Sequence, residues 1–190
     1  MLKLAWADRR DVMRFEKGLR TMGSAAMGKV EARAVNHVGL KARTQVRRAL
    51  TKQTGLKRKT IVKAVKDYRG SAANPKFSLT SRGGDIALRF FGPRETRAGV
   101  SATPFGGRKV FRGTFLRGGR FPSRVDLKMG GTVFERAGAH RLPIEKVKSG
   151  VFIPTEMVQG ETRRAFDTTV ARDLPNRLLY DLKRMAPGLF

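Results

Sequence analysis

The chain has 190 residues, 40% of them hydrophobic, which is enough for one domain with a hydrophobic core. It has no cysteine, which excludes disulfides, thiolate catalysis and cysteine-bound zinc and fits assembly in the cytoplasm, and no apolar run of about 18 residues that would span a membrane. Its 41 lysines and arginines against 15 acidic residues give a formal net charge of +26, so we expect a polyanionic or acidic partner.

The first third of the chain has helical periodicity. Hydrophobic residues from Val12 to Leu50 recur at three- and four-residue steps, which places them on one face of a long helix. Gly28 and Gly39 weaken this helix and mark points where it breaks or where another segment packs closely. Thr54 is the expected N-cap of a short second helix over Leu56–Val65.

After Pro75 the hydrophobic period changes from that of a helix to that of a strand. Phe77–Leu79 and Ile86–Phe90 alternate on either side of a glycine pair, which predicts a hairpin. Val125–Met129 and Thr132–Arg136, joined by a second glycine pair, predict another hairpin by the same pattern.

Between these two predicted hairpins the pattern is weaker. Lys109–Leu116 is expected to be a strand, whereas residues 94–107 and 117–124 have no convincing period and are interpreted as long loops. Long loops in a small domain are uncommon unless they are functional or ordered by a neighbour. The two predicted loops therefore favour an assembly protein whose loops dock on other subunits.

Helical periodicity returns near the C-terminus, where every fourth residue from Phe166 to Leu182 is hydrophobic. Pro175 lies inside this run, so we expect the helix to be kinked there. The order of elements predicts an α+β fold with a long N-terminal helix, a short second helix, an antiparallel sheet of about four to six strands with long loops, and a C-terminal helix kinked at a proline.

We expect one domain over residues 1–190. Within it, residues 1–66 are expected to be helical, 75–136 to be β-rich with extended loops, and 155–186 to form the C-terminal helical region.

The residues that could carry catalysis are few. His37 and His140 are far apart in the sequence, and each is interpreted as an ordinary polar residue. The carboxylate pairs of note are Asp8 with Asp11 and Asp126 with Glu135, which are expected to offset nearby arginines or a helix dipole. The glycine-rich segments lack the Lys-Ser/Thr of a P-loop. We therefore expect no enzymatic activity and no catalytic, cofactor-binding or metal-binding residues.

Basic residues are better organised, because no acidic residue occurs between Glu31 and Asp67 or between Glu95 and Asp126. Lysines and arginines in these two stretches are candidate contacts to DNA or to an acidic partner. The candidates are Arg43, Arg47, Arg48, Lys52, Lys57, Arg58, Lys59, Arg108, Lys109, Arg112, Arg117, Arg120 and Arg124.

Four phenylalanines alternate with the arginines of the second stretch: Phe105, Phe111, Phe115 and Phe121. Such side chains could stack on bases, but we prefer to interpret them as core residues or as anchors of a subunit interface. No helix-turn-helix or ribonucleoprotein motif is present, so base-specific recognition is not indicated.

Several short elements at the two ends of the chain resemble the minor tail protein Z family of lambda-like siphophages, which are tail-completion proteins. In the C-terminal quarter these are the Leu-Pro step and leucine-rich helix of Leu174–Leu182, the basic Arg184-Met185, and the Arg-x-Pro-Ile element Arg141–Ile144 followed by Ala165-Phe166. In the N-terminal third they are Lys17–Leu19, the small residues Gly23–Met27 and the basic element Thr54–Lys59. Residues 92–130 differ, except for Gly113–Leu116.

The resemblance implies a non-enzymatic virion protein at the head-proximal end of a phage tail, assembled in the host cytoplasm. It implies a homo-oligomeric ring, hexameric by analogy with the symmetry of the tail. The implied partners are the tail terminator, the tail tube or tape-measure protein, the head-connector proteins and viral DNA in the lumen. The alternative is a nonspecific nucleic-acid-binding protein, which the charge alone would explain.

Overall fold

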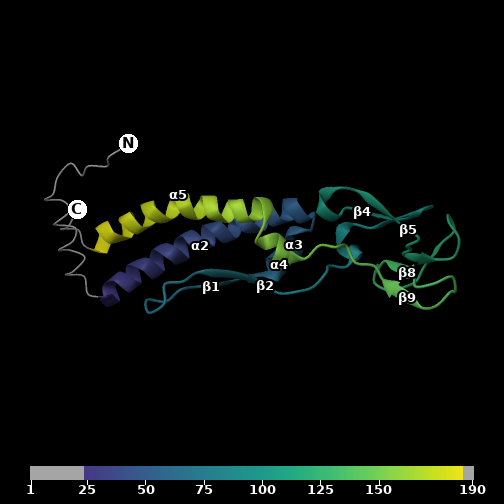
Figure 1. Cartoon of the computed structure of the whole chain (residues 1–190), viewed down its shortest axis with the longest axis horizontal. Coiled ribbons are helices and arrows are strands. Elements are labelled where there is room, and N and C mark those ends of the chain that lie inside the picture. The colour runs from purple at the N-terminus through teal and green to yellow at the C-terminus, as the bar shows by residue number, and fades with distance from the viewer. Residues whose placement is uncertain (1–23, 186–190) are drawn as a thin grey trace, which may run out of the picture. The chain divides into compact units, whose positions relative to one another are not determined.

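The computed structural model describes residues 24–185 and has the mixed α+β fold that the sequence predicts (Figure 1). The part of the predicted N-terminal helix before Ser24 and the last residue of the predicted C-terminal helical region, 186, lie outside the described residues. The chain divides into two compact units. The described part of unit 1 comprises residues 24–43, 67–79 and 167–185, and unit 2 comprises residues 44–66 and 80–166.

Helix α2 spans Ser24–Thr54 without a break. Its residues 24–43 belong to unit 1, and its residues 44–54 belong to unit 2. The predicted hydrophobic stripe is buried along its whole described length. The side chains of this stripe that are at most 1% exposed are Val30, Ala34, Val38, Ala42, Val46 and Leu50. Each fully buried Val or Leu stabilises its unit by roughly 1.5–3 kcal/mol relative to an exposed one.

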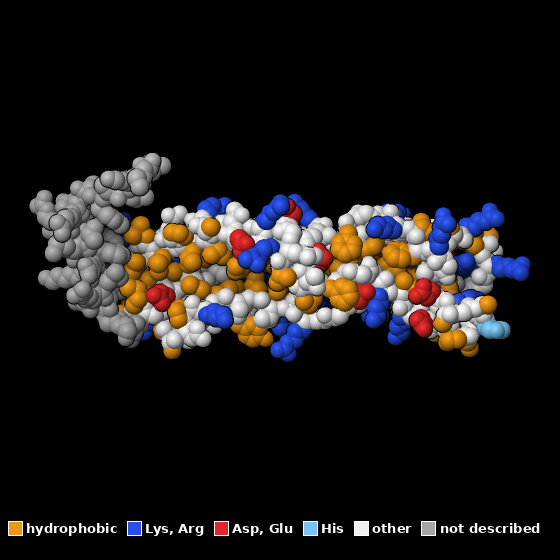
Figure 2. All heavy atoms as spheres, viewed as in Figure 1, with side chains coloured by type: hydrophobic (Ala, Val, Ile, Leu, Met, Phe, Trp, Pro, Cys, Tyr) orange, Lys and Arg blue, Asp and Glu red, His pale blue; other side chains and the backbone are white. Residues whose placement is uncertain are grey.

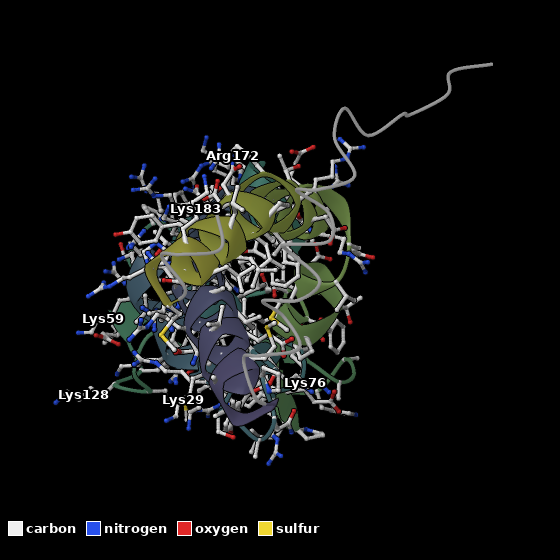
Figure 3. All side chains as sticks on the ribbon, turned by 90° about the vertical axis from the view of Figure 1, so that its left-hand side faces the viewer. Lys29, Lys59, Lys76, Lys128, Arg172 and Lys183 are labelled. Carbon is white, nitrogen blue, oxygen red and sulfur yellow. The ribbon has the colours of Figure 1, made fainter. Side chains whose placement is uncertain are left out.

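In unit 1, α2 packs antiparallel to the second half of helix α5, which spans Gly160–Met185 (Figures 1 and 3). The two glycines of α2 that were expected to break the helix or to allow close packing do the latter. A Cβ on Gly39 would lie 2.3 Å from the ring of Phe77, and one on Gly28 would lie 2.2 Å from the carbonyl oxygen of Ala72. Both glycines therefore let residues 67–79 lie directly against the helix.

Helix α5 continues through Pro175, although the sequence predicts a kink there. The bend in the C-terminal helical region lies at residues 158–159, between α4 (Ile153–Met157) and α5. Gly160 has a left-handed φ of 59°, which glycine adopts at little energetic cost. The chain therefore turns where a glycine permits it and keeps its helix at the proline.

Two short elements follow α2. Helix α3 spans Arg58–Ala64, within the range that the sequence predicts. Thr54, however, does not cap it, because its buried hydroxyl donates to the carbonyl of Leu50 at 2.6 Å and accepts from the N–H of Leu56 at 3.3 Å. Thr54 thus closes the end of α2, and Gly55, with a φ of 75°, starts the turn to α3.

The strands of the described residues form four small sheets instead of one sheet of four to six strands. These sheets are β1 (Val65–Tyr68) with β2 (Ser78–Ser81); β3 (Arg94–Thr96), β4 (Gly99–Ala102) and β5 (Lys109–Arg112); β6 (Arg117–Gly118) with β7 (Val125–Asp126); and β8 (Phe134–Arg136) with β9 (Ile144–Lys146). None of these strands exceeds four residues. Glycines with a left-handed φ, Gly113, Gly119, Gly130 and Gly131, interrupt the extended chain between β5 and β8.

The first predicted hairpin, Phe77–Leu79 with Ile86–Phe90, is wrong. Strand β2 pairs with β1, and the N–H of Ile86 donates to the carbonyl of Val151 at 3.0 Å. Leu88–Phe91 forms the 3-10 helix η1, which buries Leu88 and Phe91 on one side. Of the residues that alternate, Leu88 is buried but Phe90 is 38% exposed, so the alternation does not mark a strand with one buried face.

The interpretation of residues 94–107 as a loop is also wrong, because β3 and β4 form a tight hairpin there, followed by the 3-10 helix η2 (Pro104–Gly106). The predicted strand at Lys109–Leu116 is confirmed only for its first half, β5. The second predicted hairpin is wrong as well, since β7 pairs with β6 and β8 pairs with β9. Alternation indicates which residues are extended but not which strands pair.

No helix within residues 24–185 combines the length and the apolar character that a membrane crossing requires.

A buried polar network in unit 2 joins the end of α2 to α4 and the start of α5. The Nε2 of Gln53 donates to the Glu156 carboxylate at 2.5 Å, and its Oε1 accepts from the N–H and hydroxyl of Thr162 at 3.1 and 3.0 Å. Glu156 is 9% exposed and Thr162 is fully buried. One glutamine side chain thus satisfies both a buried carboxylate and a free N–H in the first turn of α5.

We expect Gln53→Ala to lower the free energy of unfolding by about 2–3 kcal/mol, because it leaves a buried donor and a buried carboxylate oxygen without their partner. Urea unfolding followed by circular dichroism would measure this. Gln45→Ala, which shortens another half-buried glutamine of the same helix, is the control, and equal losses in the two variants would contradict the network's role.

Candidate polyanion-binding surface

One basic surface of unit 2 is built mainly by the end of α2 and by α3. Leu50 and Ile61 bury one side of these helices, so the residues half a turn away face solvent. Arg48 and Lys52 of α2 and Lys59 and Lys63 of α3 are exposed on this side. Lys57 and Arg58 at the start of α3 and Lys66 on β1 are exposed as well, and the seven cations together are called the basic helical face below.

No acidic residue occurs in residues 44–66, and no side chain of the basic helical face forms an ion pair with another described residue. Helix α3 also has no acid in its first turn. Like charges at this density repel one another and are relieved when a polyanion approaches. The face is therefore suited to binding phosphates or a row of carboxylates.

Three of the candidate arginines lie outside this surface because the structure places them in internal contacts. Arg43 forms an ion pair with Asp67 at 2.8 Å in unit 1, and Arg47 donates to the carbonyl oxygen of Val65 at 2.6 Å in unit 2. Arg124 forms an ion pair with Glu95. These guanidinium groups hold the fold, and we remove them from the set of candidate partner contacts.

The remaining candidates of the second basic stretch are exposed on β5 and on the segment that follows it: Arg108, Lys109, Arg112, Arg117 and Arg120. Figure 2 shows lysine and arginine side chains gathered at the end of unit 2 where Figure 1 labels β5, β8 and β9. Arg108 also donates to the hydroxyl of Ser101 at 3.0 Å, which fixes it against β4. This second surface is likewise suited to an anionic partner.

The four candidate phenylalanines do not share one role. Phe115 is half-buried and packs on Phe134 with the ring centroids 6.3 Å apart, while the two backbones exchange hydrogen bonds of 2.8 and 2.9 Å. It is therefore a core contact of unit 2. Phe111 is half-buried on β5, whereas Phe105 and Phe121 are each 45% exposed. The last two remain candidate interface anchors.

In unit 1, charged groups of α2 and α5 meet. Asp181 is fully buried, and Arg177 donates to its two oxygens at 2.8 and 2.9 Å. Lys41 forms an ion pair with Asp173 at 3.5 Å. Partial desolvation, followed by the charges of Arg177 and Lys41, lowers the pKa of His37 below its usual value, against the opposing effect of the two aspartates.

The ion pair between Lys41 and Asp173 links α2 to α5, whereas Arg177 and Asp181 pair within α5. The buried carboxylate of Asp181 is fully used by one arginine, and Figure 3 shows Arg172 and Lys183 on the outer side of α5. His140 belongs to unit 2. Across residues 24–185, no three histidine, aspartate or glutamate side chains come together as metal ligands would.

One residue that sequence patterns did not single out, Glu95, contacts the segment that carries part of the second basic surface. Glu95 is the last acid before a long basic stretch, and its carboxylate accepts from the N–H groups of Leu116 and Arg117 at 2.9 and 3.2 Å as well as from Arg124. A single acid beside many arginines was the signal that could have indicated an internal role.

Comparison of the chain with protein-family models, with curated proteins and with solved structures found no match. The resemblance to tail-completion proteins therefore depends on the short sequence elements alone.

Proposed function

We propose that this chain is a non-enzymatic structural protein of a phage virion that completes the head-proximal end of the tail. The observation that carries the proposal is the basic helical face, a set of exposed cations with no acid in residues 44–66. Taken with the collinear family-like elements at both ends of the chain, it favours a component that surrounds or contacts the DNA channel. Recognition of this kind needs phosphates and not bases, since DNA of any sequence must pass.

In the proposed ring, each copy presents the same cations toward the lumen, so that weak contacts add up over the copies. Neighbouring copies would meet head to tail, as in any closed ring, and the exposed Phe105 and Phe121 are suited to such contacts. The tail terminator, the tail tube or tape-measure protein and the head connector are the proposed further partners.

Phage particles made without this protein provide the test. We expect tails that assemble but fail to join heads, seen by negative-stain microscopy as separate heads and tails, and restored joining when the wild-type chain is supplied in trans. Tails that join heads normally without the chain would contradict the proposal.

A second candidate function is nonspecific nucleic-acid binding by the free protein, which the same basic helical face favours. It predicts that the isolated chain binds duplex DNA with an affinity that falls steeply with salt, the logarithm changing by about 0.9 per phosphate contact. Such binding together with normal head–tail joining in the absence of the chain would favour this second function.

A further inference from the structure

The segment 117–124 is fixed at its base by one carboxylate. Glu95, in the middle of β3, accepts two backbone N–H groups through Oε2 and the guanidinium of Arg124 through Oε1. The side chains of Glu95 and Arg124 are only 12% and 17% exposed. Glu95 therefore holds both ends of the segment, since Leu116 and Arg117 lie at its start and Arg124 lies at its end.

The segment is also closed by its own backbone. Arg117 and Gly118 pair with Asp126 and Val125 in the β6–β7 ladder, and the N–H of Arg124 donates to the carbonyl of Pro122 at 2.9 Å. These bonds need no partner molecule. The segment, predicted from the sequence as a long loop that docks, is therefore shaped within unit 2 itself.

What this shaped loop presents outward is positive and aromatic. The side chains of Arg117, Arg120 and Phe121 are exposed, and that of Phe121 is 45% exposed. The one acid in the adjoining ladder is Asp126, which lies opposite Arg117 and whose Oδ1 accepts the N–H of Lys128 at 2.9 Å. Guanidinium groups match phosphate geometry by donating two hydrogen bonds at once.

We infer that Glu95 is a positioning residue that preorganises the 117–124 loop so that Arg117 and Arg120 bind the phosphate backbone of duplex DNA. The inference rests on the proposed function for its partner and adds which residues make the contact. A loop already held in its bound shape loses less conformational entropy on binding, so its arginines contribute more affinity than the same arginines on a free loop.

Preorganisation by Glu95 and net charge predict opposite changes in DNA affinity when Glu95 is neutralised. Neutralising Glu95 raises the net positive charge by one, so charge alone predicts tighter binding to DNA. Loss of preorganisation predicts weaker binding, although no cation has been removed. Asp126→Asn gives the matched control, because it changes the charge by the same amount on β7, in the ladder that adjoins the loop, and leaves Glu95 in place.

The experiment measures binding of the purified full chain to a labelled duplex of arbitrary sequence by fluorescence anisotropy over a salt series. We expect Asp126→Asn to bind as tightly as wild type or about twofold tighter, and Glu95→Gln to bind roughly three- to tenfold more weakly. Arg120→Gln, as reference, should lower the salt slope by about 0.9, and Glu95→Gln should lower it as well.

Amide hydrogen exchange separates loop release from a general loss of stability. In Glu95→Gln the N–H groups of Leu116 and Arg117 should exchange faster, while those of the buried Val100 and Val133 should not. Glu95→Asp is the second variant, because it keeps the charge but shortens the reach, and it should also weaken binding. If Glu95→Gln does not fold, the binding and exchange measurements on Glu95→Asp test the inference by themselves.

Tighter binding by Glu95→Gln, or an unchanged salt slope in Arg120→Gln, would overturn the inference. So would an outcome in which the loop variants weaken binding to polyglutamate and leave binding to DNA unchanged. Head–tail joining is scored separately: failure of joining in the deletion with unaffected DNA binding by the loop variants rejects the role of Glu95 and retains the proposed function.

Discussion

Gly99→Ala is expected to destabilise unit 2 by about 3 kcal/mol or more, which is a large fraction of the stability of a small domain. Gly99 has a φ of 146°, a conformation that residues with a Cβ adopt at a cost of about 1–3 kcal/mol. A Cβ at this position would also lie 2.0 Å from the carbonyl oxygen of Phe111, so that β4 and β5 would have to separate. Displacing packed backbone adds roughly 1–3 kcal/mol.

The loss should be felt throughout the three-stranded sheet, because β4 is its central strand and is buried along its length. Gly113→Ala is the matched control: it also has a left-handed φ, of 73°, but nothing lies within 4 Å of the position that the added methyl group would take, so we expect a loss of only about 1–2 kcal/mol. Urea unfolding followed by circular dichroism measures both. Equal losses would contradict the close approach of Phe111.

The helices could be predicted from the sequence because their evidence is long and redundant. The hydrophobic stripe of α2 repeats over many turns, so a single glycine such as Gly39 does not obscure the helical period. The structure adds that Gly39 lets the ring of Phe77 pack directly against the helix. The sequence predicted a kink at Pro175 within α5, but it did not predict the bend at residues 158–159, and the helix continues through Pro175.

The strand pairings could not be predicted, since they depend on contacts that no local pattern records. β8 finds its partner β9 across a seven-residue connection, residues 137–143, and Gly130-Gly131 forms a turn without joining paired strands. With strands of four residues or fewer, the alternation is too short to fix a register. The fold class followed from the order of helices and strands, but the four separate sheets did not.

The candidate site was predictable in composition but not residue by residue. Arg47 and Arg48 are neighbours in the sequence, yet Arg47 flanks the buried stripe and donates to Val65, whereas Arg48 lies opposite the stripe and faces solvent. A helical wheel drawn from Val46 and Leu50 separates them, but a count of charges does not. The same holds for Arg124, whose partner Glu95 lies on a strand that the sequence pattern missed.

The sequence element that carries much of the family resemblance also has a structural role in unit 1. Within Leu174–Leu182, Leu182 is 7% exposed, Asp181 is fully buried, and Arg177 both pairs with Asp181 and lies 5.2 Å from the ring centroid of Tyr180. Removing one partner of such a buried pair leaves an uncompensated charge. These residues therefore have structural roles within α5, and the candidate basic surfaces belong to other parts of the chain.

The double variant Lys52→Gln/Lys59→Gln is expected to weaken binding to duplex DNA more than any other pair of lysine neutralisations of equal charge. Both side chains belong to the basic helical face, where no acid and no ion pair with another described residue offsets them. If each contacts one phosphate, the slope of log K against log salt should fall by about 1.8. Anisotropy measurements from about 50 to 200 mM salt cover the range over which such slopes are resolved.

Lys29→Gln/Lys76→Gln is the control, because it removes the same charge from exposed lysines of unit 1 (Figure 3). We expect its slope to fall by less than about 0.5, since these lysines contribute only to the long-range field and that field is screened within about 10 Å at 0.1 M salt. Equal slopes for the two double variants would mean that net charge alone governs binding. The +26 charge would then be a general property of the chain, and the basic helical face would not be a site.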